Sequence, residues 1–126
     1  MPKRPIHIID FSPEVAKLQA DTIAEISRLI PHAQVEAIGS FAVPLAGKEE
    51  IDIMIISKDI LADSELLVQG GYRQGPIDDL SHLGKRVGVF RIDTHVVPEG
   101  HKMIGIYRGI IEKLKMISLS AMHTKP

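Results

Sequence analysis

The chain has 126 residues, a length that favours one domain with a single hydrophobic core. Its 15 Lys and Arg against 16 Asp and Glu give a formal net charge of −1, so binding to nucleic acid mainly through backbone charge is not expected. The absence of cysteine excludes disulfides, thiolate metal sites and a cysteine nucleophile. No apolar run approaches the roughly 20 residues of a membrane span, and no signal-peptide pattern follows the N-terminal Met. We therefore expect a cytoplasmic protein without membrane contact.

The first third of the chain predicts an edge strand followed by an amphipathic helix. Residues 6–11 are mostly apolar and are short enough for an edge strand. Ser12 and Pro13 then form a helix start, because serine caps helix N-termini and proline fits the first helical position. Apolar residues recur at helical spacing over residues 13–30, and Pro31 ends the pattern.

The middle of the chain predicts two strands and a second helix. Residues 35–38 form a short strand that leads into a loop over residues 41–48. The run over residues 51–56 contains one polar residue, Asp52, which is typical of a buried central strand. Residues 59–69 form a helix that two glycines end.

The last third predicts turns, further β-structure and a third helix. Residues 72–84 are turn-rich, and residues 87–97 are a β-rich run that breaks near Arg91. Apolar residues over 103–117 predict an amphipathic helix, and residues 120–126 a frayed tail. The whole chain, residues 1–126, is therefore interpreted as one α+β domain: a small mixed sheet packed by about three helices.

A Gly-Ser pair and two nearby carboxylates are the first candidate site residues. Gly39 and Ser40 end one strand with a tight turn whose N–H groups and hydroxyl suit a phosphate. Glu50 and Asp52 lie one strand step apart and so point to the same face. Two such carboxylates are natural ligands for Mg²⁺, which prefers oxygen donors and leaves positions for substrate phosphates.

A third carboxylate lies on the later strand. Arg91, Asp93 and His95 alternate with apolar or small residues and share one face. If this strand lies beside that of Asp52, three carboxylates meet, and their mutual repulsion favours a bound cation. The structural alternative is that Asp93 pairs with Arg91 and that backbone groups satisfy His95. The remaining histidines show no helical metal-ligand spacing, so a histidine zinc site is not expected.

Besides Gly39 and Ser40, the candidate phosphate ligands are Arg91 and His95 on the later strand, Lys48 and Arg108, with Arg91 or Arg108 neutralising phosphate charge. Lys48 is either a solvated loop charge or a contact for an anion at Ser40. Arg108 lies on the last predicted helix, where the alternative is an i,i+4 pair with Glu112.

Residues 35–53 resemble the signature of the GrpB family, which belongs to the nucleotidyltransferase superfamily with the palm-type domain of DNA polymerase β. The resemblance extends over most of the chain, through Gly71-Tyr72, the run 95–97 and Tyr107-Arg108. It implies a nucleotidyltransferase-like fold more firmly than a reaction.

The chain also departs from the family pattern. The loop is one residue shorter, because Pro44 runs directly into Leu45. Glu50 stands where the family usually lacks the first carboxylate, and Asp93 stands where it often has histidine. Glu50, Asp52 and Asp93 thus resemble the acidic triad of the superfamily more than the usual GrpB site.

The resulting hypothesis is a Mg²⁺-dependent transfer of a nucleotide from a nucleoside triphosphate to an unknown hydroxyl acceptor. Gly39 and Ser40 would hold the triphosphate, the three carboxylates the metal, and Asp93 would activate the hydroxyl. One alternative is a catalytically degenerate module that binds a nucleotide or phosphometabolite. Another is an antitoxin-like interaction protein or a homodimer, since the last helix is apolar over a wide arc at residues 104–111.

Overall fold

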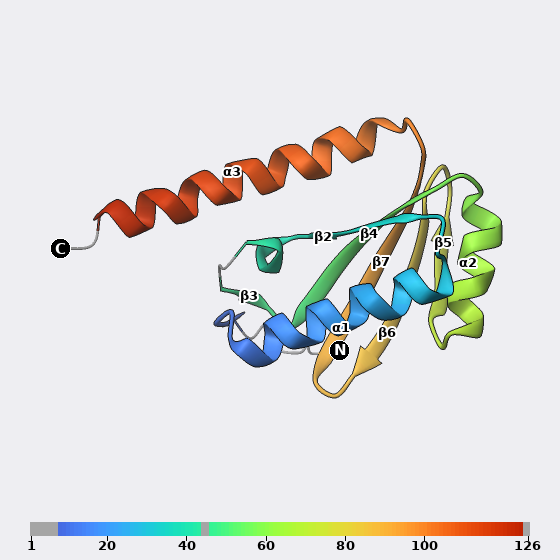
Figure 1. The fold of residues 1–126 in the computed structure, drawn as a ribbon, viewed down its shortest axis with the longest axis horizontal. Helices are drawn as coiled ribbons and strands as arrows, with labels where there is room; N and C mark the ends of the chain where they lie inside the picture. Colours follow the sequence, from blue (N-terminus) through green and yellow to red (C-terminus); the bar gives the residue numbers. More distant parts are fainter. Residues whose placement is uncertain (1–7, 44–45, 125–126) are drawn as a thin grey trace, which may run out of the picture.

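The computed structural model describes residues 8–43 and 46–124, which form a twisted sheet with helices on both faces (Figure 1). In chain order the elements are β1 (Ile8–Ile9), α1 (Pro13–Leu29), β2 (Gln34–Ile38), the 3₁₀ turn η1 (Ser40–Ala42), β3 (Gly47–Lys48), β4 (Glu50–Ser57), α2 (Ile60–Gln69), β5 (Arg73–Ile77), β6 (Ser81–Val87), β7 (Phe90–Pro98) and α3 (Lys102–Thr124). The main sheet has the order β2-β4-β7-β6-β5, and β1 pairs with β3 in a separate ribbon. This arrangement confirms the predicted α+β class.

The sheet is mixed because one of its four pairings is parallel. β4 and β7 run parallel at its centre, whereas β2–β4, β7–β6 and β6–β5 are antiparallel. The chain passes from β4 to β7 through α2 and the β5–β6 hairpin, a long connection of the kind that parallel neighbours require. The two central strands therefore start at the same end of the sheet.

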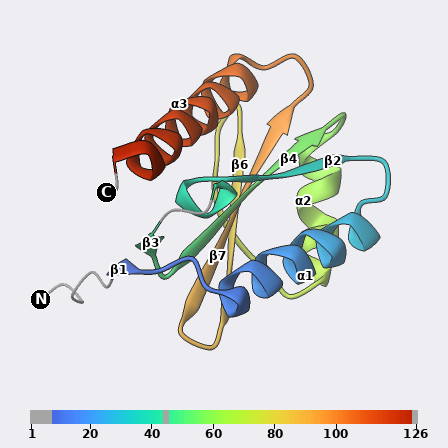
Figure 2. The same cartoon turned by 60° about the vertical axis from the view of Figure 1, so that its left-hand side comes forward.

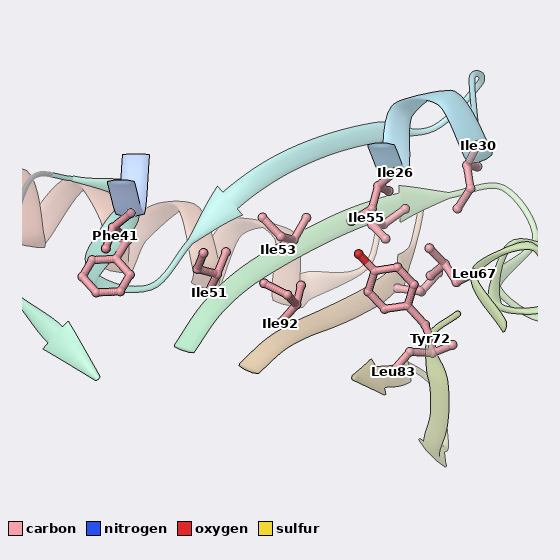
Figure 3. Close-up of a cluster of buried hydrophobic side chains, with 12 residues drawn as sticks. Ile26, Ile30, Phe41, Ile51, Ile53, Ile55, Leu67, Tyr72, Leu83 and Ile92 are labelled. Atoms are coloured by element: carbon pink, nitrogen blue, oxygen red, sulfur yellow. The ribbon is translucent and has the colours of Figure 1, made fainter. Parts of the chain in front are cut away.

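The residues of β4 alternate between two different environments. Ile51, Ile53 and Ile55 are fully buried and pack with α1, α2 and Ile92 in the larger core (Figure 3). Met54 and Ile56 face the other way, into a smaller cluster under α3. Figure 2 shows α1 and α2 on one side of the sheet and α3 on the other. The carboxylate of Asp52 is on the α3 side, because strand side chains alternate.

Helix α3 packs on the sheet with one part of its surface only. Met103, Ile104, Tyr107 and Ile111 contact the smaller core cluster, whereas residues on its outer side such as Ile106 and Ile110 are exposed. The C-terminal half of the helix extends past the edge of the sheet in Figure 1. Within the described residues, no helix is long and apolar enough to cross a membrane.

The predicted helix boundaries agree with the structure to within one residue for α1 and α2. The Ser12 hydroxyl accepts a hydrogen bond from the N–H of Val15 at 3.2 Å, and Pro13 is in the first turn of α1. Asp59 caps α2 by accepting from the N–H of Ala62 at 3.1 Å. These ends are determined by local capping chemistry, which a sequence displays directly.

Five sequence predictions need correction. Residues 72–84, predicted as turn-rich, contain β5 and the start of β6; β5 accommodates Pro76 because it is an edge strand. The 87–97 run breaks at Gly88, which has φ +61°, and not near Arg91.

The expected loop over 41–48 contains β3, and the predicted frayed tail is helical through Thr124. The expected strand over 6–11 is limited to Ile8–Ile9 among the described residues.

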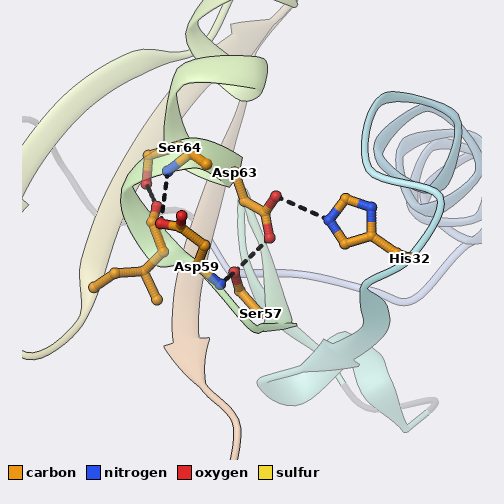
Figure 4. A network of polar contacts seen from close by, with 7 residues as sticks. His32, Ser57, Asp59, Asp63 and Ser64 are labelled. Carbon is orange, nitrogen blue, oxygen red and sulfur yellow. Dashed lines mark hydrogen bonds and ion pairs between the residues drawn. The ribbon is translucent and has the colours of Figure 1, made fainter.

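A buried polar network fastens α2 to the end of β4 (Figure 4). The side chain of Asp63 is only 2% exposed. It accepts a hydrogen bond from the Ser57 hydroxyl, and its other oxygen lies 3.2 Å from Nε2 of His32. The Ser57 hydroxyl in turn accepts from the N–H of Asp59 at 3.0 Å. The network thus joins the ends of three elements of the fold.

We predict that Asp63→Ala lowers the free energy of unfolding by about 2–4 kcal/mol, because it leaves buried polar partners unsatisfied. Glu65→Ala on the exposed side of the same helix is the control and should change stability by less than about 0.5 kcal/mol. The measurement is urea denaturation of both variants. A change in Asp63→Ala no larger than that in the control would contradict this role of the network.

Candidate functional site

Three predicted carboxylates come together on the α3 side of the sheet. Glu50 and Asp52 lie on β4 and Asp93 on β7, and Asp52 and Asp93 are directly paired in the parallel register. One carboxylate oxygen of each lies within 4.8 Å of those of the other two, and all three residues are half-buried. We call these three residues the acidic cluster. Three negative charges at this separation repel one another and are stabilised by a cation.

Arg91 neutralises one member of the acidic cluster. Its Nε donates to Oδ1 of Asp93 at 2.9 Å, with the Arg91 side chain 60% exposed. The Asp93–Arg91 pair, which the sequence offers as the structural alternative to a metal site, is therefore present in the structure. It uses one oxygen of Asp93, and the arrangement still places that residue in the cluster. One arginine against three carboxylates leaves the local charge negative.

His95 connects the acidic cluster to α3. Its Nε2 lies 3.6 Å from Oδ1 of Asp52, and its Nδ1 lies 3.5 Å from the hydroxyl of Tyr107. Burial raises the pKa of the Tyr107 hydroxyl, and the negative charge of Asp52 raises it further. Tyr107 therefore stays protonated at neutral pH. The sequence places Tyr107 in the apolar stripe of the last helix and in the resemblance to the GrpB family. It does not predict the contact with His95, because that contact depends on how α3 docks.

The absence of a side chain at Gly39 leaves room for the carboxylate of Asp52. Its φ of +80° lies in the left-handed region, and a Cβ atom built on it would come within 2.9 Å of Oδ2 of Asp52. The turn continues into η1 through a hydrogen bond from the N–H of Ala42 to the Gly39 carbonyl at 3.1 Å. Ser40 begins η1, but its hydroxyl, a predicted phosphate ligand, lies outside the described side chains, as do Pro44 and Leu45 of the loop.

The two other predicted cations lie in different places. Lys48 is exposed on β3, two residues before Glu50. Arg108 forms a two-pronged ion pair with Glu36 of β2, with its Nε 3.1 Å from Oε1. Glu36 is paired with Met54, further along the strands than Asp52. The structure thus joins Arg108 to the β2 edge and not to Glu112.

Beside the acidic cluster, a hollow of about 850 Å³ extends over β5, β6 and β7. Asp93, His95 and Arg91 line it on one side. Its other lining includes Arg73 and Arg86, which sequence reasoning missed. The period-two pattern from His82 through Gly84 to Arg86 would indicate Arg86 if the 72–84 segment were interpreted as a hairpin. Arg73 follows only from the register of that hairpin, which places it opposite Gly84.

The acidic cluster meets the chemical requirements of a Mg²⁺ site. It offers oxygen donors from three side chains, and these remain partly accessible to solvent. Mg²⁺ is usually bound through one or two carboxylates together with water and substrate phosphates, which such an open position permits. The donor set therefore fits a divalent metal of this kind.

Comparisons with known proteins bear on the fold. No protein-family model matches the sequence, and no curated protein matches it. Among solved structures, the conserved protein GrpB from Enterococcus faecalis matches with a TM-score of 0.66 and 19% identity over 77% of this chain. The Cid1 poly(U) polymerase matches with a TM-score of 0.51 and 17% identity over 70% of it. A structure of Cid1 in complex with the UTP analogue UMPNPP also has a TM-score of 0.51, at 16% identity.

The chain has a nucleotidyltransferase-like fold. This confirms the fold that the resemblance to the GrpB family implied. The chain spans 64% of the length of the GrpB protein and 32% of that of Cid1. At identities below 20% these matches concern the architecture, and the chemistry has to be argued from the side chains.

We predict that Gly39→Ala costs more stability than Gly100→Ala. Both glycines have similar positive φ values, +80° and +76°, so both substitutions strain the backbone by about 1–2 kcal/mol. A Cβ at Gly100 meets open space, whereas at Gly39 it collides with Asp52. Denaturation should reveal an extra loss of about 1 kcal/mol in Gly39→Ala. Equal losses would show that the Gly39–Asp52 contact relaxes without cost.

Proposed function

We propose that the protein transfers a nucleotide from a nucleoside triphosphate to a hydroxyl acceptor in a Mg²⁺-dependent reaction. The observation that carries this proposal is the convergence of Glu50, Asp52 and Asp93 from two parallel neighbouring strands. The nucleotidyltransferase-like fold supports it. Glu50, Asp52 and Asp93 would hold the metal, which when bound supplies positive charge that neutralises and orients the triphosphate.

The chain's own residues have distinct roles in this proposal. Gly39 presents its turn beside Asp52, so that backbone N–H groups and the adjacent Ser40 can contact the triphosphate. Asp93 accepts the proton of the acceptor hydroxyl, and Arg91 holds the carboxylate of Asp93 through Oδ1 while contributing positive charge beside the phosphates. Lys48 is a further candidate for the triphosphate.

His95 is a positioning residue in this proposal. It lies between Asp52 and Tyr107 and restricts the Asp52 side chain from the side of α3. Arg108, which pairs with Glu36, supports the docking of α3. It would contact phosphate only if that ion pair opened.

A second candidate function is binding to a partner or to a second copy of the chain. The observation that favours it is the exposure of Ile106 and Ile110, at 46% and 47%, on the outer side of α3. This role does not require the acidic cluster. Measuring the mass of the protein in solution, together with the metal and nucleotide tests below, separates partner binding from nucleotide transfer. A module that binds nucleotide without turnover would respond in the nucleotide binding test but show no transfer.

We predict that Glu50→Gln abolishes most of the stabilisation by Mg²⁺ while raising the stability of the metal-free protein. Removing one of three like charges relieves repulsion by about 0.5–1 kcal/mol, and the same change removes a metal ligand. Thermal unfolding in EDTA and in Mg²⁺ measures both effects. Glu99→Gln, at an exposed turn, is the matched control and should leave both unchanged. A Glu50→Gln variant that responds to Mg²⁺ like the wild type excludes this metal site.

We predict that Asp52→Asn abolishes nucleotide transfer and leaves the fold intact. Thermal unfolding with Mg²⁺ and each of the four ribonucleoside triphosphates identifies the base. A ligand at a hundred times its dissociation constant adds about 2.7 kcal/mol to stability. This stabilisation should require metal and triphosphate together in the wild type and should be lost in Asp52→Asn. Turnover that persists in the variant would falsify the proposed mechanism.

A further inference from the structure

The floor of the hollow over β5–β7 is a row of residues that crosses the sheet. Arg73 on β5 is paired with Gly84 on β6, and Gly84 is paired with Asp93 on β7. Directly paired residues of antiparallel strands point to the same face, so all three belong to the face that carries the acidic cluster. Two strand spacings of about 4.8 Å separate the backbones of Arg73 and Asp93. Because Gly84 has no side chain, the floor between them is open.

A second row adds two more arginines to the same face. Arg86 is directly paired with Arg91. Among the described residues, Arg73 and Arg86 have no ion pair or hydrogen bond to another side chain, and both are exposed. Lys85, by contrast, points to the opposite face, where it pairs with Glu25 at 3.1 Å. The hollow thus contains two arginines without a counter-charge beside the candidate base Asp93.

We infer that this hollow binds the acceptor, and that the acceptor is a small alcohol carrying a phosphomonoester. The inference rests on the proposed function, since Asp93 is the group toward which the acceptor hydroxyl would point. Arg73, which lies across Gly84 from Asp93, and Arg86, two residues beyond Gly84 on β6, bind the phosphate. Guanidinium groups recognise phosphate oxygens through paired N–H donors. The molecule spans the bare floor, and its hydroxyl reaches Asp93.

Charge and size favour this class of acceptor over two others. Two unpaired guanidinium groups balance the charge of a phosphomonoester, which is close to −2 at neutral pH, whereas a carboxylate needs only one. A volume of about 850 Å³ is that of a small-molecule site. The net charge of −1 gives no general attraction for a polynucleotide, whose binding depends on many cationic contacts.

The step that follows is balanced within the two substrates. The acceptor oxygen forms a bond to the α-phosphorus of the triphosphate, and the bond from that phosphorus to the bridging oxygen of pyrophosphate breaks. The hydroxyl proton passes to Asp93 and then to solvent. The products are pyrophosphate and a phosphodiester that keeps the original phosphomonoester of the acceptor. The phosphate on Arg73 and Arg86 does not react.

The test uses glycerol 3-phosphate as the probe and amide NMR spectra of the whole chain in EDTA, at constant ionic strength. We expect the probe to shift the resonances of Gly84 and its neighbours without metal or nucleotide. Glycerol should have no effect. Arg73→Gln and Arg86→Gln should each weaken binding about tenfold, the typical loss of one charge-assisted contact. Arg28→Gln, an exposed arginine on α1, is the matched control and should bind like the wild type.

Three results would overturn the inference: no binding to the wild type, equal binding to all the arginine variants, or shifts confined to residues outside the hollow. Binding of glycerate as strong as that of glycerol 3-phosphate would overturn the assignment to phosphate. Arginine-dependent binding of an oligoribonucleotide without terminal phosphate, tighter than that of the probe, would assign the hollow to a nucleic acid instead.

The same series separates this inference from the proposed function. Asp52→Asn should lose the joint effect of Mg²⁺ and triphosphate but keep the binding of glycerol 3-phosphate. Arg73→Gln and Arg86→Gln should show the reverse pattern. If the wild type binds the probe in the hollow yet shows no response to metal and triphosphate, the phosphate site stands and nucleotidyl transfer fails.

Discussion

The parallel pairing of β4 with β7 is the constraint on which the candidate site depends. Its register places Asp52 beside Asp93 on one face, and Ile51 and Ile53 with Ile92 in the core on the other. A slip of one residue in either strand would move its carboxylate into the apolar core and expose an isoleucine. The packing of the larger core therefore fixes the position of the carboxylates, although these residues contribute little to that packing themselves.

The β5–β6 hairpin adds positive charge to the face of the sheet that carries the acidic cluster. It is inserted in the connection between the two central strands and extends the sheet beyond β7. Gly84 and Arg86 of this hairpin pair directly with Asp93 and Arg91. The face thus changes from negative over β4 and β7 to positive over β6 and β5, with the Arg91–Asp93 ion pair at the boundary. The long crossover between β4 and β7 therefore contributes charged surface as well as connectivity.

The sequence predicted the features of this protein that depend on local chemistry. The Ser12 cap and the apolar spacing predict helix α1. Asp52 stands out as the one polar residue in an apolar strand, where burying a carboxylate is costly. The 72–84 segment was misinterpreted because Gly75 and Pro76 are typical of turns, and only a place at the sheet edge makes them compatible with a strand. For the same reason the sequence does not predict the basic side of the hollow, which Arg73 and Arg86 form. Strand order is a non-local property. The sequence therefore predicts the convergence of Asp93 with Asp52 only on the condition that their two strands are neighbours.

The division of the sheet into a packed face and an open face bears on how the protein can change. Ile53, Ile55 and Leu67 are fully buried and hold α1 and α2 to the sheet, where each lost side chain leaves a cavity. The opposite face is covered by α3 over β2, β4 and part of β7, and its charged residues keep access to solvent. Substitutions of these charges alter electrostatics without opening cavities, so the charge of the open face can change with little loss of fold stability. The carboxylates of the acidic cluster repel one another in the absence of a cation, so the acidic cluster is the part of this face that a structural role explains least.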